Sequence, residues 1–281
     1  RERIESALDD VVGDQPGDSP GDALLVGPYS LTTPCPLQLV HPADDYVEQT
    51  STVRRRLGLL ALRRASELDG ERTRGSEPDL ARAVDEVLQE REGWPTGLGR
   101  WFGELGRAGR STVRAAVLTW CVDVTRLVGG AARSGAARRI RWTDPFMPQR
   151  VDQAGRRVRL RGGADAVLGG RTEGEKLLLV TDAAPGAADR LRAGHLAVVH
   201  SLASGRAPLR VTLGSPATGR LSPQPVDESL LELAADRIVE VVGYLADPER
   251  ASARPGPWCR YCHLLDDCAE GAAEVRPTHR E

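Results

Sequence analysis

The sequence predicts an α/β protein in which a central mixed β-sheet is flanked by helices and preceded by a helical region. Three observations lead to this prediction. Apolar residues recur at helical spacing within residues 45–135, and from about residue 138 short apolar runs alternate with glycine pairs. A long amphipathic segment over 227–245 then returns to the helical period, and it begins with acidic side chains that favour a helix N-terminus.

The helical region is expected to contain helices over 53–68 and 78–89, where apolar side chains recur three or four residues apart. Residues 94–110 hold two tryptophans and five glycines, and this composition predicts an irregular link. A further helix is expected over about 111–128, which is largely apolar. The part of the chain before the sheet is therefore mostly helical.

Short apolar runs separated by glycine-rich turns predict a β-meander of three or four strands. These runs are residues 139–142, 158–160, 164–168 and 176–180. A helix over 187–204 and a strand over 209–213 follow, before the long helix over 227–245. The sheet core is expected to span about 138–250.

Length and composition indicate one compact unit. The chain has 281 residues, 40% of them hydrophobic, which is enough for one large core. We expect a single domain over 23–270 that closes with a cysteine cluster at 255–268. Residues 1–22 are acidic and rich in glycine and proline, which predicts a flexible arm, and 271–281 are expected to form a tail.

The sequence gives no sign of export or of a membrane partner. No apolar run is long enough to span a bilayer, and the first residues given do not follow the basic, apolar and small-residue order of a leader. Five cysteines are a sparse and odd set for a chain of this length, which argues against a disulfide framework and for a reducing compartment. We therefore expect a cytoplasmic protein, whose oligomeric state the sequence does not indicate.

Four of the five cysteines form a candidate metal centre. Cys259, Cys262 and Cys268 follow the spacing C-x2-C-x5-C, and Cys35 lies far upstream. Four thiolates converging on one point can hold zinc or an iron–sulfur cluster. Such a centre would join the N-terminal region to the C-terminus. Cys121 lies in an apolar helical stretch, and we interpret it as a small hydrophobic core residue.

The order of elements and the cysteine cluster together resemble the PD-(D/E)xK nuclease superfamily. The most similar branch contains the iron–sulfur RecB-like and AddB-like nuclease domains and the CRISPR-adaptation exonucleases. The resemblance covers roughly 24–270, and its clearest motifs are Pro-Gly-Pro-Trp-Cys-Arg-Tyr-Cys at 255–262 and Thr-Pro-Cys-Pro at 33–36. It implies a restriction-endonuclease-like core with a C-terminal iron–sulfur clip. It also implies a 4Fe-4S cluster on Cys35, Cys259, Cys262 and Cys268, with Zn2+ as the alternative.

The resemblance implies two acidic residues that hold Mg2+ or Mn2+. Asp165 in Gly-Gly-Ala-Asp-Ala-Val and Asp182 at the end of Leu-Leu-Leu-Val-Thr-Asp match these positions. Divalent ions of this kind prefer carboxylate oxygens and carry the attacking water. The lysine of the family motif falls on Ala184, and no histidine follows Gly58, where the family has a metal ligand. These two departures point to decay of catalysis.

Arginines provide a candidate nucleic-acid surface. Arg157, Arg159 and Arg161 alternate along one predicted strand and therefore share one side of it. An ordinary solvated surface is an equally good interpretation, because the formal net charge of the chain is only -2.

Three functions remain open at this stage. The first is a catalytically degenerate nuclease-fold protein with an iron–sulfur cluster, which binds DNA or a protein partner in DNA metabolism or its regulation. The second is an active Mg2+- or Mn2+-dependent DNA exonuclease or endonuclease that uses Asp165 and Asp182. The third is a redox or regulatory module based on the cluster.

Overall fold

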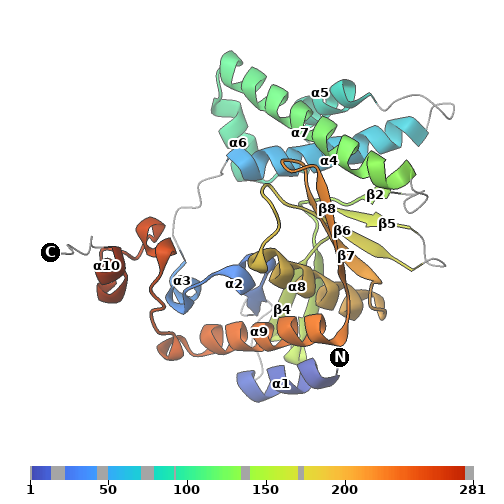
Figure 1. The fold of residues 1–281 in the computed structure, drawn as a ribbon. Coiled ribbons are helices and arrows are strands. Elements are labelled where there is room, and N and C mark those ends of the chain that lie inside the picture. The colour runs from blue at the N-terminus through green and yellow to red at the C-terminus, as the bar shows by residue number, and fades with distance from the viewer. Residues whose placement is uncertain are drawn as a thin grey trace.

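A computed structural model describes residues 2–13, 23–42, 50–70, 79–91, 93–133, 140–169 and 174–275. Figure 1 shows a central layer of strands between two layers of helices, with the C-terminal segment placed to one side of the helix α9 (Glu228–Ala246). The predicted α/β class with a mixed sheet is confirmed. No helix in the described ranges is long and apolar enough to cross a bilayer.

The larger sheet has the order β2-β5-β6-β7-β8 in the described part of the chain. Its strands are β2 (Ile140–Trp142), β5 (Ala166–Leu168), β6 (Lys176–Val180), β7 (Arg210–Ser215) and β8 (Arg220–Pro225). Among the described strands of this larger sheet, only β6 and β7 pair in parallel. The helix α8 (Ala187–Ser204) makes the crossover that a parallel pair requires. The C-terminal ends of β6 and β7 therefore point to the same side of the molecule.

A second, three-stranded sheet corrects the predicted meander. It consists of β1 (Leu24–Val26), β4 (Val158–Gly162) and β3 (Gln149–Gln153) in the order β1-β4-β3. The prediction that 158–160 is part of one meander with its neighbours is wrong, because β4 pairs with β1 and β3. The chain bends at 163–165 before β5 starts, and this bend moves it from one sheet to the other.

One hydrophobic core lies between the larger sheet and a helical layer made of α4 (Thr50–Gly70), α5 (Leu80–Glu90), α6 (Thr96–Glu104) and α7 (Arg107–Arg133). The prediction of an irregular link over 94–110 is wrong, because α6 forms there and buries Phe102. Trp94 packs edge-on against the Phe102 ring, with centroids 5.5 Å apart. The packing of aromatic side chains in and beside α6 outweighs the low helix propensity of its glycines.

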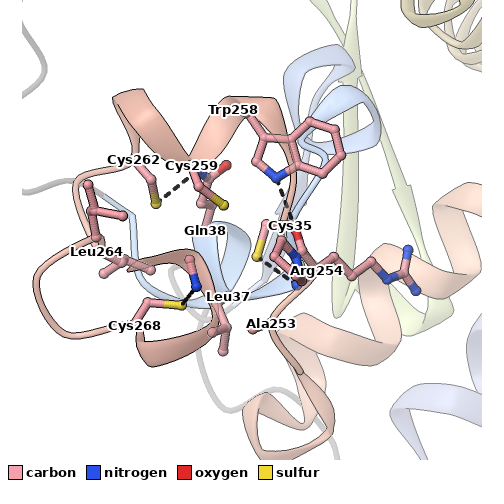
Figure 2. Close-up of a pocket in the computed structure, with 13 residues that line it drawn as sticks. Cys35, Leu37, Gln38, Ala253, Arg254, Trp258, Cys259, Cys262, Leu264 and Cys268 are labelled. Atoms are coloured by element: carbon pink, nitrogen blue, oxygen red, sulfur yellow. Dashed lines mark hydrogen bonds between the residues drawn. The ribbon is translucent and has the colours of Figure 1, made fainter. Parts of the chain in front are cut away.

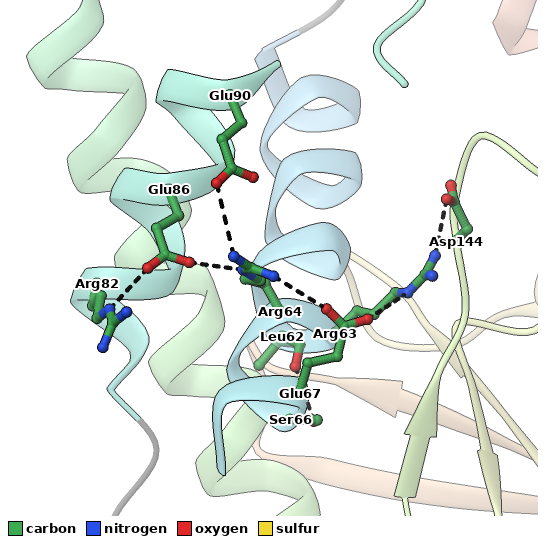
Figure 3. A network of polar contacts seen from close by, with 9 residues as sticks. All are labelled: Leu62, Arg63, Arg64, Ser66, Glu67, Arg82, Glu86, Glu90 and Asp144. Carbon is green, nitrogen blue, oxygen red and sulfur yellow. Dashed lines mark hydrogen bonds and ion pairs between the residues drawn. The ribbon is translucent and has the colours of Figure 1, made fainter. Parts of the chain in front are cut away.

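Ion pairs hold the helical layer together at its surface (Figure 3). Arg64 Nε on α4 donates to Glu86 on α5 at 2.7 Å, and Arg82 donates to the same carboxylate at 2.8 Å. The neighbouring residue on α4, Arg63, donates through Nη1 to Asp144, in the connection between β2 and β3, at 3.0 Å. Because these groups are partly exposed, the network fixes the position of α4 more than it adds stability.

The close crossing of α4 and α7 yields a stability prediction. A Cβ added at Gly58 would lie 2.3 Å from Cε3 of Trp120, which is buried. We expect Gly58→Ala to lower the free energy of unfolding by about 1–3 kcal/mol through overpacking. Urea denaturation measures this loss. Gly129→Ala is the matched control, because no atom lies within 4 Å of the added Cβ; an unchanged Gly58→Ala protein would contradict the close packing.

A second core lies beneath the three-stranded sheet and includes α8, α9 and the N-terminal helix α1 (Glu2–Val12). The prediction of a flexible arm over 1–22 is wrong for residues 2–12, because Ile4 and Leu8 lie on one face of α1 and pack in this core. Residues 14–22 of that prediction lie outside the described residues.

The C-terminal segment returns to the N-terminal part of the chain. The short helices α2 (Pro28–Thr32) and α3 (Pro36–Val40) follow β1, and η3 (Pro257–Tyr261) and α10 (Ala269–Val275) follow α9. The 3₁₀ turns η1 (Ala154–Arg156) and η2 (Pro248–Arg250) join neighbouring elements. The predicted tail over 271–281 is wrong for 271–275, which are part of α10; the last six residues of that prediction lie outside the described ranges.

Candidate functional site

The four cysteines of the predicted metal centre line one small pocket, with Leu and Trp side chains around them (Figure 2). Cys35 immediately precedes α3, Cys259 lies in η3, Cys262 follows η3 and Cys268 precedes α10. Two segments that lie more than two hundred residues apart in the sequence therefore meet at these four sulfur atoms.

Each of the four sulfur atoms accepts a hydrogen bond from a nitrogen. The backbone N–H groups of Arg254, Gly256 and Gly271 donate to Cys35, Cys259 and Cys268, at 3.4, 3.4 and 3.3 Å. The fourth donor is a side chain, because Nε2 of Gln38 lies 3.1 Å from Cys262 Sγ. In metalloproteins, N–H donors of this kind orient sulfur ligands and tune the bound centre.

Backbone packing around the sulfur atoms is close. A Cβ at Gly271 would lie 3.3 Å from Cys268 Sγ and 3.5 Å from Cys259 Sγ, so a side chain at this position of α10 would crowd the sulfur atoms. Leu37, Leu264 and Trp258 provide apolar walls. Four thiols, four N–H donors and an apolar lining fit the donor set of a 4Fe-4S cluster.

Among the described residues, no three His, Cys, Asp or Glu side chains are grouped so that they could hold a single metal ion. Zinc needs its sulfur ligands at about 2.3 Å from one centre, whereas a cubane cluster holds its thiolates at separate corners.

Cys121 is separate from this centre. It lies in α7, is fully buried, and directs its Sγ at the carbonyl of Gly58 at 3.4 Å. Burial raises the pKa of Cys121 to about 12, so the thiol stays protonated. Its surroundings agree with a hydrophobic packing role.

Asp165 and Asp182 lie near the larger sheet, but both carboxylates already have cationic partners. Asp165 lies in the bend between β4 and β5, where it is only 3% exposed and accepts from the Val180 N–H at 2.6 Å. Its second oxygen accepts from Arg55 Nη2 at 2.5 Å. Asp182 lies beyond the end of β6 and accepts from Arg54 Nη2 at 3.0 Å.

Arg54 and Arg55 are the residues that sequence analysis did not connect to the site. Burial opposes the charge on Arg55, but the attraction of Asp165 outweighs it, so the pKa of Arg55 is raised and the guanidinium remains charged. The signal available in the sequence is an arginine run inside a helix that buries one apolar face. Its pairing with residues more than a hundred positions away could not be predicted without the fold.

No lysine is near these carboxylates in the described structure. Lys176, the only lysine of the chain, starts β6, whereas Asp182 follows the other end of that strand. Ala184, at the position of the motif lysine, is exposed and offers no charge. The charges beside Asp165 and Asp182 therefore come from Arg55 and Arg54 of α4.

A cleft of about 330 Å³ opens beside Asp165. Its lining includes Arg55 and Arg56 from α4, Arg161 from β4, and Arg192 from α8. His195 of α8 forms part of the wall, and its Nε2 lies 2.9 Å from the carbonyl oxygen of Arg161. Burial lowers the pKa of His195, so the imidazole is neutral and Nε2 is the donor in this contact.

The predicted arginine track is only partly available. Arg157 lies 3.3 Å from Asp9 on α1, and Arg159 lies 2.7 Å from Asp152 on β3. Arg161 instead lines the cleft. Of the three arginines, Arg161 is therefore the one that the structure brings to the neighbourhood of Asp165.

Comparisons with known proteins assign neither a family nor a fold. No protein-family model matches the sequence, and no curated protein matches it. Among solved structures, a crystal structure of SSO0001 shares 14% sequence identity and covers 95% of this chain and 93% of its own, with a TM-score of 0.30. This similarity is too weak to carry an argument about function.

Proposed function

We propose that this chain is a nuclease-fold protein of the PD-(D/E)xK type that has lost DNA cleavage and now binds DNA. The order β5-β6-α8-β7 supports a restriction-endonuclease-like core, because an antiparallel pair is followed by a helical crossover to a parallel strand. Asp165 before β5 and Asp182 after β6 support the assignment of the two motif carboxylates that the sequence resemblance implies.

The observation that carries the proposal is the guanidinium of Arg55 bound to Asp165. Metal-dependent nucleases need free carboxylate oxygens to hold Mg2+ or Mn2+ and its water. Here one oxygen of Asp165 is bound by Arg55 and the other by a backbone N–H. Arg54 binds one oxygen of Asp182, whose side chain is 43% exposed. Because arginine does not release its proton near neutral pH, it cannot replace the motif lysine in moving protons.

The four cysteines support a 4Fe-4S cluster that closes the fold, with Zn2+ as the alternative. When bound, such a cluster supplies a covalent link between the chain ends and one-electron redox chemistry. Cys35, Cys259, Cys262 and Cys268 would be its ligands, and their four N–H donors would stabilise the thiolates.

We expect no metal-dependent cleavage by the unmodified protein. With Mg2+ or Mn2+, hydrolysis of single- and double-stranded DNA should not exceed the level of the Asp165→Ala variant, because the carboxylates are paired and position 184 lacks a cation. End-labelled substrates resolved on denaturing gels provide the measurement. Robust cleavage that Asp165→Ala abolishes would refute the loss of catalysis and establish an active nuclease.

A separate measurement tests DNA binding. We expect weak binding at low salt that declines as salt rises, since arginine–phosphate contacts release counterions. Fluorescence anisotropy with a labelled oligonucleotide in EDTA measures it. Absence of binding at low salt would refute the DNA-binding part of the proposal and favour a protein partner or a cluster-based regulatory role.

A further inference from the structure

The β3–β4 ladder contains an uncompensated pair of like charges. Arg150 of β3 lies directly opposite Arg161 of β4, and such pairs share one face of the sheet. The neighbouring pair on the same face, Asp152 and Arg159, is complementary and forms an ion pair at 2.7 Å. Among described residues, no carboxylate forms an ion pair with Arg150 or Arg161. Two opposed arginines destabilise a sheet, and such local violations concentrate at functional sites.

Arg161 faces a cleft whose acidic groups are already neutralised. Four arginines and two aspartates line this cleft among the described residues. Arg192 is also paired with Asp189 at 3.0 Å, and Asp144 is paired with Arg63, so the lining and these two outside partners together hold five arginines against three aspartates, an excess of two positive charges. Asp165 is bound by Arg55, and Asp144 is bound by Arg63 at 3.0 Å. The cleft therefore suits an anion with two negative charges, which is the charge of a phosphate monoester near neutral pH.

The cleft also offers an aromatic surface next to these charges. Tyr29 of α2 lines the cleft and is 63% exposed, and the guanidinium of Arg192 lies 5.5 Å from its ring centroid. An exposed tyrosine held by a cation provides a stacking surface for a nucleobase. Gly162 and Gly163 add a stretch of wall without side chains, where a ligand can approach the backbone.

We propose that this cleft binds a nucleoside monophosphate unit without a divalent metal. The phosphate lies against Arg161 and Arg192, and the base stacks on Tyr29. A volume of about 330 Å³ holds one such unit, and it falls at the lower end of small-ligand clefts, roughly 300–1,000 Å³. This unit is either the phosphorylated end of a DNA strand or a free nucleotide. The first of these two ligands rests on the proposed DNA binding.

The test compares ligands that differ by one phosphate, in EDTA. A labelled single-stranded oligonucleotide is titrated with its terminal phosphate at the 5′ end, at the 3′ end, or absent, and adenosine monophosphate is used as a competitor. We expect one phosphorylated end to bind at least about tenfold more tightly than the unphosphorylated strand, since charge-assisted contacts to phosphate are the strong ones. Arg161→Gln should remove this preference.

Arg159→Gln is the matched control, because Arg159 is on the same strand and face but is paired with Asp152 outside the cleft. The Arg159→Gln protein should prefer a terminal phosphate as strongly as the unmodified protein does. Tyr29→Ala should weaken binding of the base-containing ligands several-fold, whereas Tyr29→Phe, which keeps the ring, should not. Circular dichroism spectra establish that the variants are folded.

The outcomes separate this inference from the proposed function. The strand affinity could be the same with and without the terminal phosphate and unchanged by Arg161→Gln. This result would leave DNA binding intact and overturn the cleft assignment. Binding of adenosine monophosphate without strand binding would refute the proposed DNA binding and assign the cleft to a free nucleotide. Failure of both ligands to bind would overturn both.

Discussion

Replacing Cys259 with serine is expected to release the metal centre and destabilise the whole fold. Cys259 comes from η3 and shares its pocket with Cys35, which lies before α3 near the other end of the chain. A structural metal contributes its binding free energy to folding, about 10–16 kcal/mol for structural zinc at neutral pH. Loss of one of four ligands removes a large part of that contribution, so we expect a loss of several kcal/mol in the free energy of unfolding.

Iron content and colour provide the measurement. Protein purified without oxygen should be brown, absorb near roughly 400 nm and hold about four irons per chain, and Cys259→Ser and Cys35→Ser should both lose this signal. Cys121→Ser should retain its metal, because Cys121 lies in the helical layer and bonds only to the Gly58 carbonyl. A colourless protein with stoichiometric zinc would contradict the cluster and establish the alternative metal.

The helices with strong periodicity were predictable from sequence alone. The predicted helix over 187–204 matches α8 (Ala187–Ser204), and the one over 227–245 lies one residue from α9 (Glu228–Ala246). α8 is buried on all sides over 193–200, whereas α9 buries one apolar face and has Asp227 as an N-cap that accepts from the Leu230 N–H. Local sequence and tertiary packing agree in these two helices.

The strands and the charge pairs depend on distant contacts and were predicted less well. β8 contains Pro223 and Pro225, which argue against a strand unless it lies at the edge of a sheet, and β8 is the last strand in the order. The division into two sheets depends on a bend at 163–165 that periodicity does not indicate. Asp165 could be proposed from its motif, but its partner Arg55 is 110 positions away.

Removing Arg55 is expected to destabilise the protein by about 3–5 kcal/mol, because a buried carboxylate would lose its counter-charge. The side chain of Asp165 is 4% exposed and that of Arg55 is 20% exposed, so water cannot replace the lost contact well. Urea denaturation of Arg55→Leu measures the change. The double variant Arg55→Leu with Asp165→Leu should recover much of the loss, since no buried charge then remains unpaired.

A second variant, Arg55→Ala, tests whether Arg55 occupies the place of a metal ion. In this variant, the Asp165 oxygen that Arg55 had bound becomes free. A second carboxylate, Asp182, is the partner of the adjacent residue Arg54. We expect Mn2+ to raise the Tm of Arg55→Ala, because a cation that binds only the folded state stabilises it by mass action. Each kcal/mol gained corresponds to roughly 2–4 °C in a protein of this size class.

Two comparisons make the metal effect specific to Arg55. The unmodified protein should show no Mn2+-dependent rise in Tm, since the guanidinium already neutralises Asp165. Arg63→Ala removes an arginine from the same helix, which is paired with the less buried Asp144, and should also give no rise. If Mn2+ does not stabilise Arg55→Ala beyond these two proteins, then Asp165 is not a former metal ligand and its pairing with Arg55 is structural. A rise confined to Arg55→Ala would instead connect the loss of catalysis to one arginine on α4 that took over the charge of the metal.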